Sequence, residues 1–165
     1  MSDQMLSASK QFLNKNNISK IKPPLLGIDY GNKNFGLAIT DQKGIIASPL
    51  KTIKLKDNNL EEVLARIKDV IEGYKIKTII LGVPQEFSPA HQENTKRILD
   101  FKIKLEELTN IDILLYDESY STVNSYLALR ETGQKQRKAK KKIDSVASAY
   151  FLQELINMKN NKNET

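Results

Sequence analysis

Four acidic residues stand at positions where a purely structural role is hard to assign. Asp29 interrupts an apolar stretch, residues 25–31 (LLGIDYG), where an uncompensated buried carboxylate would be strongly unfavourable. Asp117 and Glu118 end another apolar stretch, and Asp144 follows a run of basic residues at the start of a helical pattern. Converging carboxylates repel one another, and a divalent cation relieves that repulsion. Oxygen ligands of this kind indicate Mg²⁺ or Mn²⁺ rather than zinc.

A sheet flanked by helices is the arrangement that would bring these acids together. Apolar runs predict strands over residues 25–31, 35–41, 45–53, 77–83 and 111–117, and apolar periodicity predicts helices over residues 60–74, 89–109, 122–130 and 143–158. Short turns join the first three strands and favour an antiparallel meander, whereas helices between the later strands require crossovers. We therefore expect an α/β fold with a five-stranded mixed sheet, in which the carboxyl ends of neighbouring strands meet at one edge.

One domain accounts for most of the chain. A length of 165 residues with 39% hydrophobic residues suffices for one core, and we place this domain at residues 25–158. Residues 1–24 are polar and end in two prolines, so we expect a disordered or loosely helical extension there. Residues 159–165 are expected to form a flexible tail.

The composition excludes several classes of protein. The chain has no cysteine and one histidine, His91, which excludes a disulfide scaffold, a thiol nucleophile and a histidine-rich metal cage. No apolar run approaches the roughly 18 residues that a membrane span requires, so we expect no membrane association. The absence of cysteine and of a signal peptide suits a reducing cytoplasm.

The excess positive charge is concentrated in one short segment, which we call the basic stretch. Lysine and arginine number 26 against 20 acidic residues, and the formal net charge of +6 equals the number of basic residues in this segment. Its basic members are Lys135, Arg137, Lys138, Lys140, Lys141 and Lys142. We expect a loop there that binds the phosphate backbone of a nucleic acid together with Lys33, although a mobile, solvated loop would have the same composition.

Four segments of the chain, in order, resemble the motifs of the YqgF (RuvX) family. GIDYGNKNFGLA (residues 27–38) resembles the family's opening motif, and LGVP (residues 81–84) is similar to its Gly-Leu-Pro segment. DESYSTV (residues 117–123) resembles an Asp-Glu-Arg-Leu-Ser-Thr-Val block, and KIDSVASA (residues 142–149) resembles the closing Asp-Ser-x-Ala-x-Ala helix. Each motif is weakly specific by itself, but four in the same order are a specific signal.

The resemblance implies a ribonuclease H-like fold and a nuclease that matures the 5′ end of pre-16S ribosomal RNA. Carried over by position, Asp29, Glu118 and Asp144 would be the catalytic acids, and with Asp117 they would bind two Mg²⁺ or Mn²⁺ ions. The chain departs from the family pattern at Ser119, where the family has arginine.

Alternative functions remain open at this level. The same resemblance implies a resolvase of four-way DNA (Holliday) junctions, and RNA and branched DNA present the same phosphates. A non-catalytic nucleic-acid-binding module on the same fold would also account for Ser119. The Asp-x-Gly turn occurs in actin-like and sugar-kinase ATPases, but these need two such domains and 165 residues are too few. Either a monomer or a homodimer is compatible with the sequence.

Overall fold

The computed structural model describes residues 12–14, 17–31, 33–83, 92–117 and 136–163, and for residues 92, 94, 117, 136–144, 162 and 163 it describes the backbone alone. Its elements, in chain order, are η1 (Ile18–Lys20), β1 (Leu25–Tyr30), β2 (Asn34–Thr40), β3 (Ala47–Lys54), α2 (Leu60–Tyr74), β4 (Thr78–Val83), α3 (Gln92–Thr109), β5 (Ile113–Asp117) and α5 (Gln136–Asn163). The predicted helix over residues 122–130 lies outside the described residues, as do Glu118, Ser119 and Lys135.

The strands form one mixed sheet in the order β3-β2-β1-β4-β5. β2 pairs antiparallel with both β1 and β3, whereas β4 lies parallel to β1 and β5 lies parallel to β4. The antiparallel part follows from short turns and the parallel part from the crossovers through α2 and α3. The predicted five-stranded mixed sheet is therefore confirmed.

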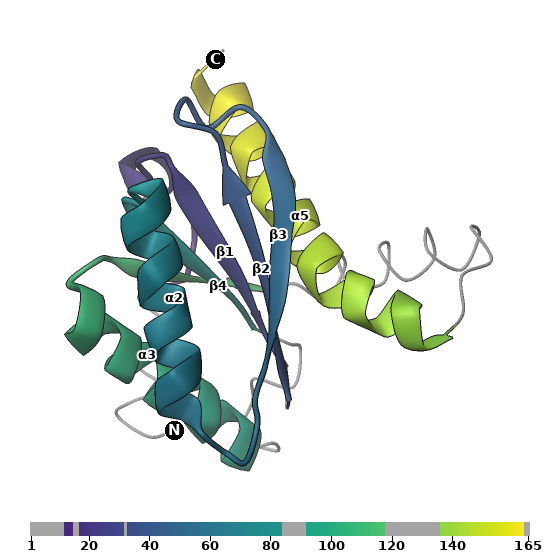
Figure 1. The fold of residues 1–165 in the computed structure, drawn as a ribbon. Helices are drawn as coiled ribbons and strands as arrows, with labels where there is room; N and C mark the ends of the chain where they lie inside the picture. The colour runs from purple at the N-terminus through teal and green to yellow at the C-terminus, as the bar shows by residue number, and fades with distance from the viewer. Residues whose placement is uncertain (1–11, 15–16, 32, 84–91, 118–135, 164–165) are drawn as a thin grey trace.

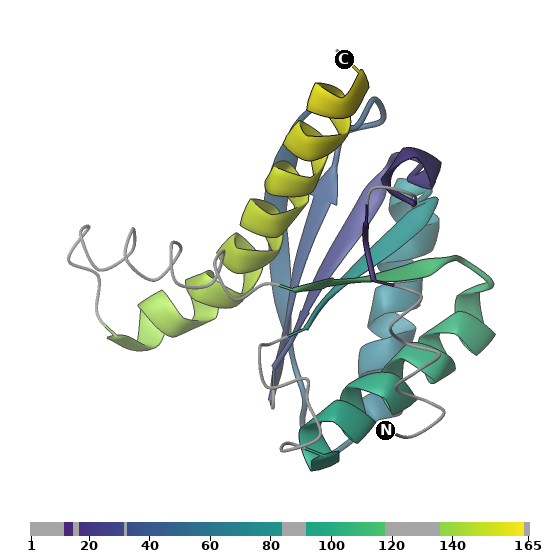
Figure 2. The same ribbon diagram turned by 180° about the vertical axis from the view of Figure 1, so that it is seen from behind.

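The helices cover the sheet on both faces, as Figures 1 and 2 show. α2 and α3 pack on one face around a core that includes Ile28, Ile67 and Phe101. α5 packs on the other face, where Leu152 and Phe151 join Ile80 in a second core. Successive residues of β1 therefore alternate between the two cores, as expected for a central strand whose two faces are both buried. None of the described helices is long and apolar enough to cross a membrane.

The segment before β1, expected to be disordered or loosely helical, is partly ordered where it is described, and it includes the short helix η1. Leu13 donates its backbone N–H to the carbonyl of Leu115 (2.9 Å), and Phe12 forms a parallel bridge with the same residue at the outer edge of β5. Ile18 and Ile21 are buried in the core under α5. The few apolar residues of this polar segment therefore suffice to hold it, because they fall where the sheet edge and α5 leave apolar surface to cover.

The basic stretch differs from the expected loop, because α5 begins at Gln136 instead of Ile143. Five of its six basic residues thus lie in the first two turns of the helix, and α5 continues to Asn163 through most of the expected tail. Lysine, arginine, glutamine and alanine are good helix formers, and no glycine or proline interrupts them here. Figure 1 shows these first turns projecting away from the sheet.

Candidate nuclease site

Asp29 lies near the carboxyl end of the central strand β1 and is only 8% exposed. Its register partners are Gly36 on β2 and Gly82 on β4, so no side chain flanks it on either neighbouring strand. Two glycines at these positions leave the face of the sheet around the carboxylate free of Cβ atoms. No side chain of β2 or β4 therefore lies between Asp29 and an ion or phosphate approaching along these two strands.

Asp29 lies on the face of the sheet that α5 covers. Gly27, two residues earlier on the same face, lies directly under Leu152: a Cβ atom at Gly27 would be 2.8 Å from Leu152 Cγ. Further along the helix, the Ser148 hydroxyl donates a hydrogen bond of 2.6 Å to the carbonyl of Gly36, the residue paired with Asp29. Ser148 is fully buried, so this bond fixes α5 on the sheet next to the carboxylate.

Replacing Gly27 by alanine is expected to lower the free energy of unfolding by about 1–3 kcal/mol, because the new methyl overlaps the buried side chain of Leu152. The matched control is Gly73→Ala in α2, where a Cβ meets no atom within 4 Å. That control is expected to raise stability by about 0.5–1 kcal/mol, since alanine is the better helix former. Urea unfolding of the two variants measures the difference, and equal midpoints would contradict the close approach of α5 at Gly27.

The backbone of α5 carries Asp144 to the same end of the sheet. From Leu152 to Ser148 the helix rises about 6 Å, which matches the roughly 6.7 Å from Gly27 to Asp29 along the strand. Asp144 occupies the next turn, four residues before Ser148 and further in the same direction. The backbone of this turn therefore lies on the side of Ser148 that faces the carboxyl end of β1.

The carboxyl end of β5 completes the same edge of the sheet. Tyr116 pairs with Gly82, which in turn pairs with Asp29, so β5 ends at Asp117 one residue past the level of Asp29. The Tyr116 hydroxyl and a Glu154 carboxylate oxygen are 2.6 Å apart, and this hydrogen bond joins β5 to α5. Glu118 follows Asp117 in the sequence and lies outside the described residues.

The structure describes the four expected acids in different degrees of detail. Asp29 is described with its side chain, Asp117 and Asp144 through their backbone, and Glu118 is outside the described part. Among the described side chains, no group of three acids or histidines is close enough to hold a metal ion. The metal ligation of the four acids accordingly stays a prediction, although the backbone brings Asp29, Asp117 and Asp144 to one end of the sheet.

Two contributors to this environment were not among the expected site residues. Gly82 opens the β4 side of Asp29, and Ser148 holds α5 in place through its hydroxyl. The glycine of LGVP and the small residues one turn after Asp144 are the available signals in the sequence. Neither signal identifies the strand or the carbonyl that each residue would face, because strand order and register are tertiary properties.

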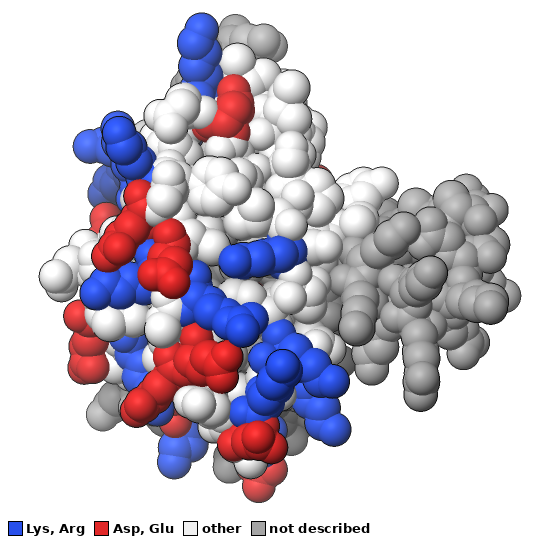
Figure 3. All heavy atoms as spheres, viewed as in Figure 1, with Lys and Arg blue, Asp and Glu red and all other residues white. Residues whose placement is uncertain are grey.

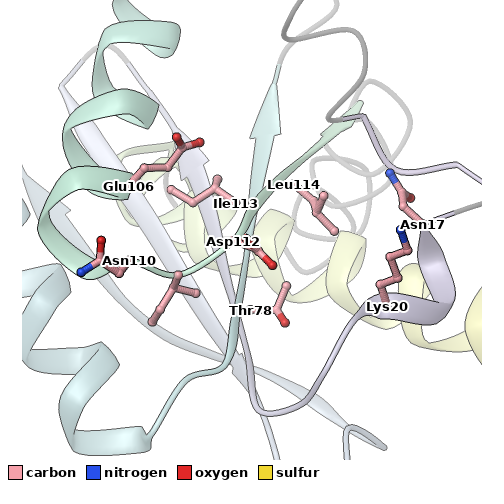
Figure 4. A pocket seen from close by; sticks show the side chains of 9 residues that line it. Asn17, Lys20, Thr78, Glu106, Asn110, Asp112, Ile113 and Leu114 are labelled. Carbon is pink, nitrogen blue, oxygen red and sulfur yellow. The ribbon is translucent and has the colours of Figure 1, made fainter.

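A cavity of about 420 Å³ lies at the opposite end of the strands (Figure 4). It is lined by residues at the amino ends of β4 and β5, including Thr78 and Asp112, and by Lys20 of the N-terminal segment. Asp29, near the carboxyl end of β1, is not among the residues that line it. The cavity is therefore separate from the acids and does not contribute to the candidate site.

Comparisons with known proteins show the family of the chain. A family model described as "RuvX: Holliday junction resolvase" matches residues 24–158. A Clostridium acetobutylicum protein named "Putative pre-16S rRNA nuclease" is 34% identical over 133 residues, covering 81% of this chain and 97% of that protein. A Rickettsia conorii protein of the same name is also 34% identical over 133 residues, covering 81% of this chain and 85% of that protein.

The fold has a counterpart among solved structures. Thermus thermophilus RuvC in complex with a Holliday junction substrate superposes with a TM-score of 0.53 and 16% sequence identity. The match covers 86% of this chain and 96% of that chain. At this identity the likeness concerns the fold alone, and it confirms the expected ribonuclease H-like architecture.

Proposed function

Because the chain belongs to the RuvX family, we propose that it is a metal-dependent endonuclease that matures the 5′ end of pre-16S ribosomal RNA in the cytoplasm. The observation that carries this proposal is the position of Asp29, a nearly buried carboxylate between two glycines at the end of the sheet where β5 ends and α5 passes. The names of the relatives in C. acetobutylicum and R. conorii support ribosomal RNA as the substrate.

The surroundings of Asp29 fit a divalent cation. Its two register partners are glycines, so no side chain at these positions would compete with an ion for the carboxylate. The donors that the chain offers at this end of the sheet are carboxylate oxygens, which suit Mg²⁺ and Mn²⁺. Asp29, Glu118 and Asp144 would hold two ions, with Asp117 beside them. Such ions, when bound, activate a water molecule and stabilise the leaving oxygen of an in-line displacement.

The remaining residues position the substrate and the acids. The Ser148 hydrogen bond to Gly36 keeps α5, and with it the turn of Asp144, at a constant distance from Asp29. Lys140 and Lys141 precede Asp144 by one helical turn, so the basic stretch adjoins the acids along α5. Lysine suits binding of the phosphate backbone without recognition of the base sequence, because it is a point charge without the forked geometry of arginine.

Cleavage assays on two substrates test the proposed function. The purified protein, with Mn²⁺ or Mg²⁺, is expected to cleave a 16S rRNA precursor near its mature 5′ end and to leave a four-way DNA junction intact. The junction is the second candidate substrate, because the matching family model is described as a Holliday junction resolvase. Preferential cleavage of the junction would favour that alternative, and binding of RNA without metal-dependent cleavage would favour a non-catalytic module.

Ser119→Arg is expected to increase the turnover number about 10²-fold with little change in substrate affinity. The residue follows Glu118 in the sequence, and an arginine there would meet the negative charge that grows on the phosphate in the transition state. Single-turnover cleavage of one RNA substrate at saturating metal, by the natural protein and by the variant, measures the effect. Equal rates would show that another cation, with Lys33 the nearest candidate, already supplies this charge.

A further inference from the structure

We propose that Lys54, at the end of the edge strand β3, forms a second phosphate-binding subsite for the nucleic-acid backbone, with Asn34 beside it. The inference rests on the proposed function, since it names a further contact of the same substrate. It places a cation on the side of Asp29 that faces away from β4 and β5. The substrate backbone would then cross the end of the sheet between two cationic groups, the basic stretch on α5 and Lys54 on β3.

The register of the sheet places Lys54 on the same face as Asp29. Asp29 pairs with Gly36, and Gly36 pairs with Thr52, so these three residues form a row across β1, β2 and β3. Lys54 pairs with Asn34 in the next row on this face, towards the carboxyl end of β1. Lys51 pairs with Leu37 of the other core and therefore lies on the opposite face of β3.

The surroundings of Lys54 leave its charge available. Lys54 and Lys33 are exposed, and in the described part of the chain neither takes part in an ion pair. Arg66 and Lys68 on α2 differ, because each lies beside a glutamate one turn away. The backbone N–H of Leu55 donates to the carbonyl of Lys33 (2.7 Å), which holds the end of β3 against the β1–β2 turn. Figure 3, which views the face of the sheet that α2 covers, shows basic side chains next to acidic ones near this end of β3.

The spacing fits a nucleic-acid strand that passes over Asp29. Lys54 lies two strands away from Asp29 and two residues further along the sheet. The backbones of the two residues are therefore about 12 Å apart. Successive phosphates of one strand are closer together than this distance, so Lys54 would meet a phosphate a few nucleotides away from the one at Asp29. A lysine at this distance anchors the backbone without entering the reaction, so its loss weakens binding and leaves the chemical step intact.

The test compares Lys54→Gln with Lys51→Gln, which removes the same charge from the same strand on the opposite face. Binding of a labelled 16S rRNA precursor fragment, and of a labelled four-way DNA junction, is measured by anisotropy over a range of salt concentrations. Lys54→Gln is expected to reduce the slope of log affinity against log salt by about 0.7–0.9 and to weaken binding severalfold at low salt. Lys51→Gln is expected to behave like the natural protein, and thermal melting should be the same for all three.

The first two outcomes below separate this inference from the proposed function. If both variants bind like the natural protein while cleavage is intact, the subsite is wrong and the nuclease function stands. If the natural protein binds without cleaving and only Lys54→Gln lowers the slope, the subsite stands and the nuclease function fails. If the natural protein binds neither nucleic acid, both are overturned.

Discussion

Asp29→Asn is expected to abolish metal-dependent cleavage, with a rate at least about 10³-fold below that of the natural protein. The amide replaces one carboxylate oxygen by an uncharged donor group and removes a negative charge that the proposed cations need. In the absence of metal the melting temperature is expected to stay the same or to rise, because repulsion among the converging acids decreases. Single-turnover cleavage and thermal melting with EDTA measure the two effects.

Asp112→Asn is the matched control for this change. Asp112 lies just before β5 at its amino end, lines the cavity at the opposite end of the strands, and is exposed. Its amide variant is expected to cleave at the rate of the natural protein. A large loss of metal-free stability in Asp29→Asn with cleavage preserved would show that Asp29 has a structural role and would overturn the proposed site.

Replacing the six basic residues of the basic stretch by glutamine is expected to weaken nucleic-acid binding more than any other surface change. Each lost phosphate contact lowers the slope of log affinity against log salt by about 0.7–0.9, so six contacts would account for most of the salt dependence. Glutamine is also a good helix former, so the first turns of α5 should be retained. Salt titrations of binding, with circular dichroism as a check on helix content, measure the result.

A control for this variant removes lysines at the other end of the molecule. Lys22, Lys43, Lys75 and Lys77 are exposed and lie near the amino ends of β1 and β4 or at the turn between β2 and β3. When these four lysines are replaced by glutamine, each charge removed is expected to change the slope of log affinity against log salt only slightly. Equal changes per charge in the two variants would mean that only the net charge matters, and the basic stretch would then be no specific contact.

The sequence by itself determined the elements and most of the chemistry. Apolar runs predicted all five strands, most clearly β1 and β4, because these two strands are buried on both faces and read as nearly continuous apolar runs. Asp29 stood out for the same reason, since a carboxylate within such a run requires a compensating partner. The concentration of charge in the basic stretch was also visible without any structure.

The local conformation of the basic stretch was predicted wrongly, and the contacts of the N-terminal segment were not predicted, in both cases for physical reasons. The density of like charge suggested a loop, but lysine and arginine favour helix when nothing interrupts them, and α5 begins at Gln136. The polar N-terminal segment suggested a disordered or loosely helical extension without fixed contacts, but Phe12, Ile18 and Ile21 contact β5 and the core under α5. Whether a few apolar residues hold a polar segment depends on which surface lies within their reach, and the sequence does not contain that information locally.

Only the tertiary structure decided what surrounds Asp29. Gly36 and Gly82 lie 7 and 53 positions away in the sequence, and they become its neighbours because β1 is paired on one side with β2 and on the other with β4. The hydrogen bond from Ser148 to Gly36 likewise joins residues 112 positions apart. The apolar pattern of a strand determines which residues share a face, but not which strand lies beside it or in what register. Those choices depend on how the crossovers and α5 pack against the whole sheet, and they place the end of β5, the turn of Asp144 and Lys54 around the same carboxylate.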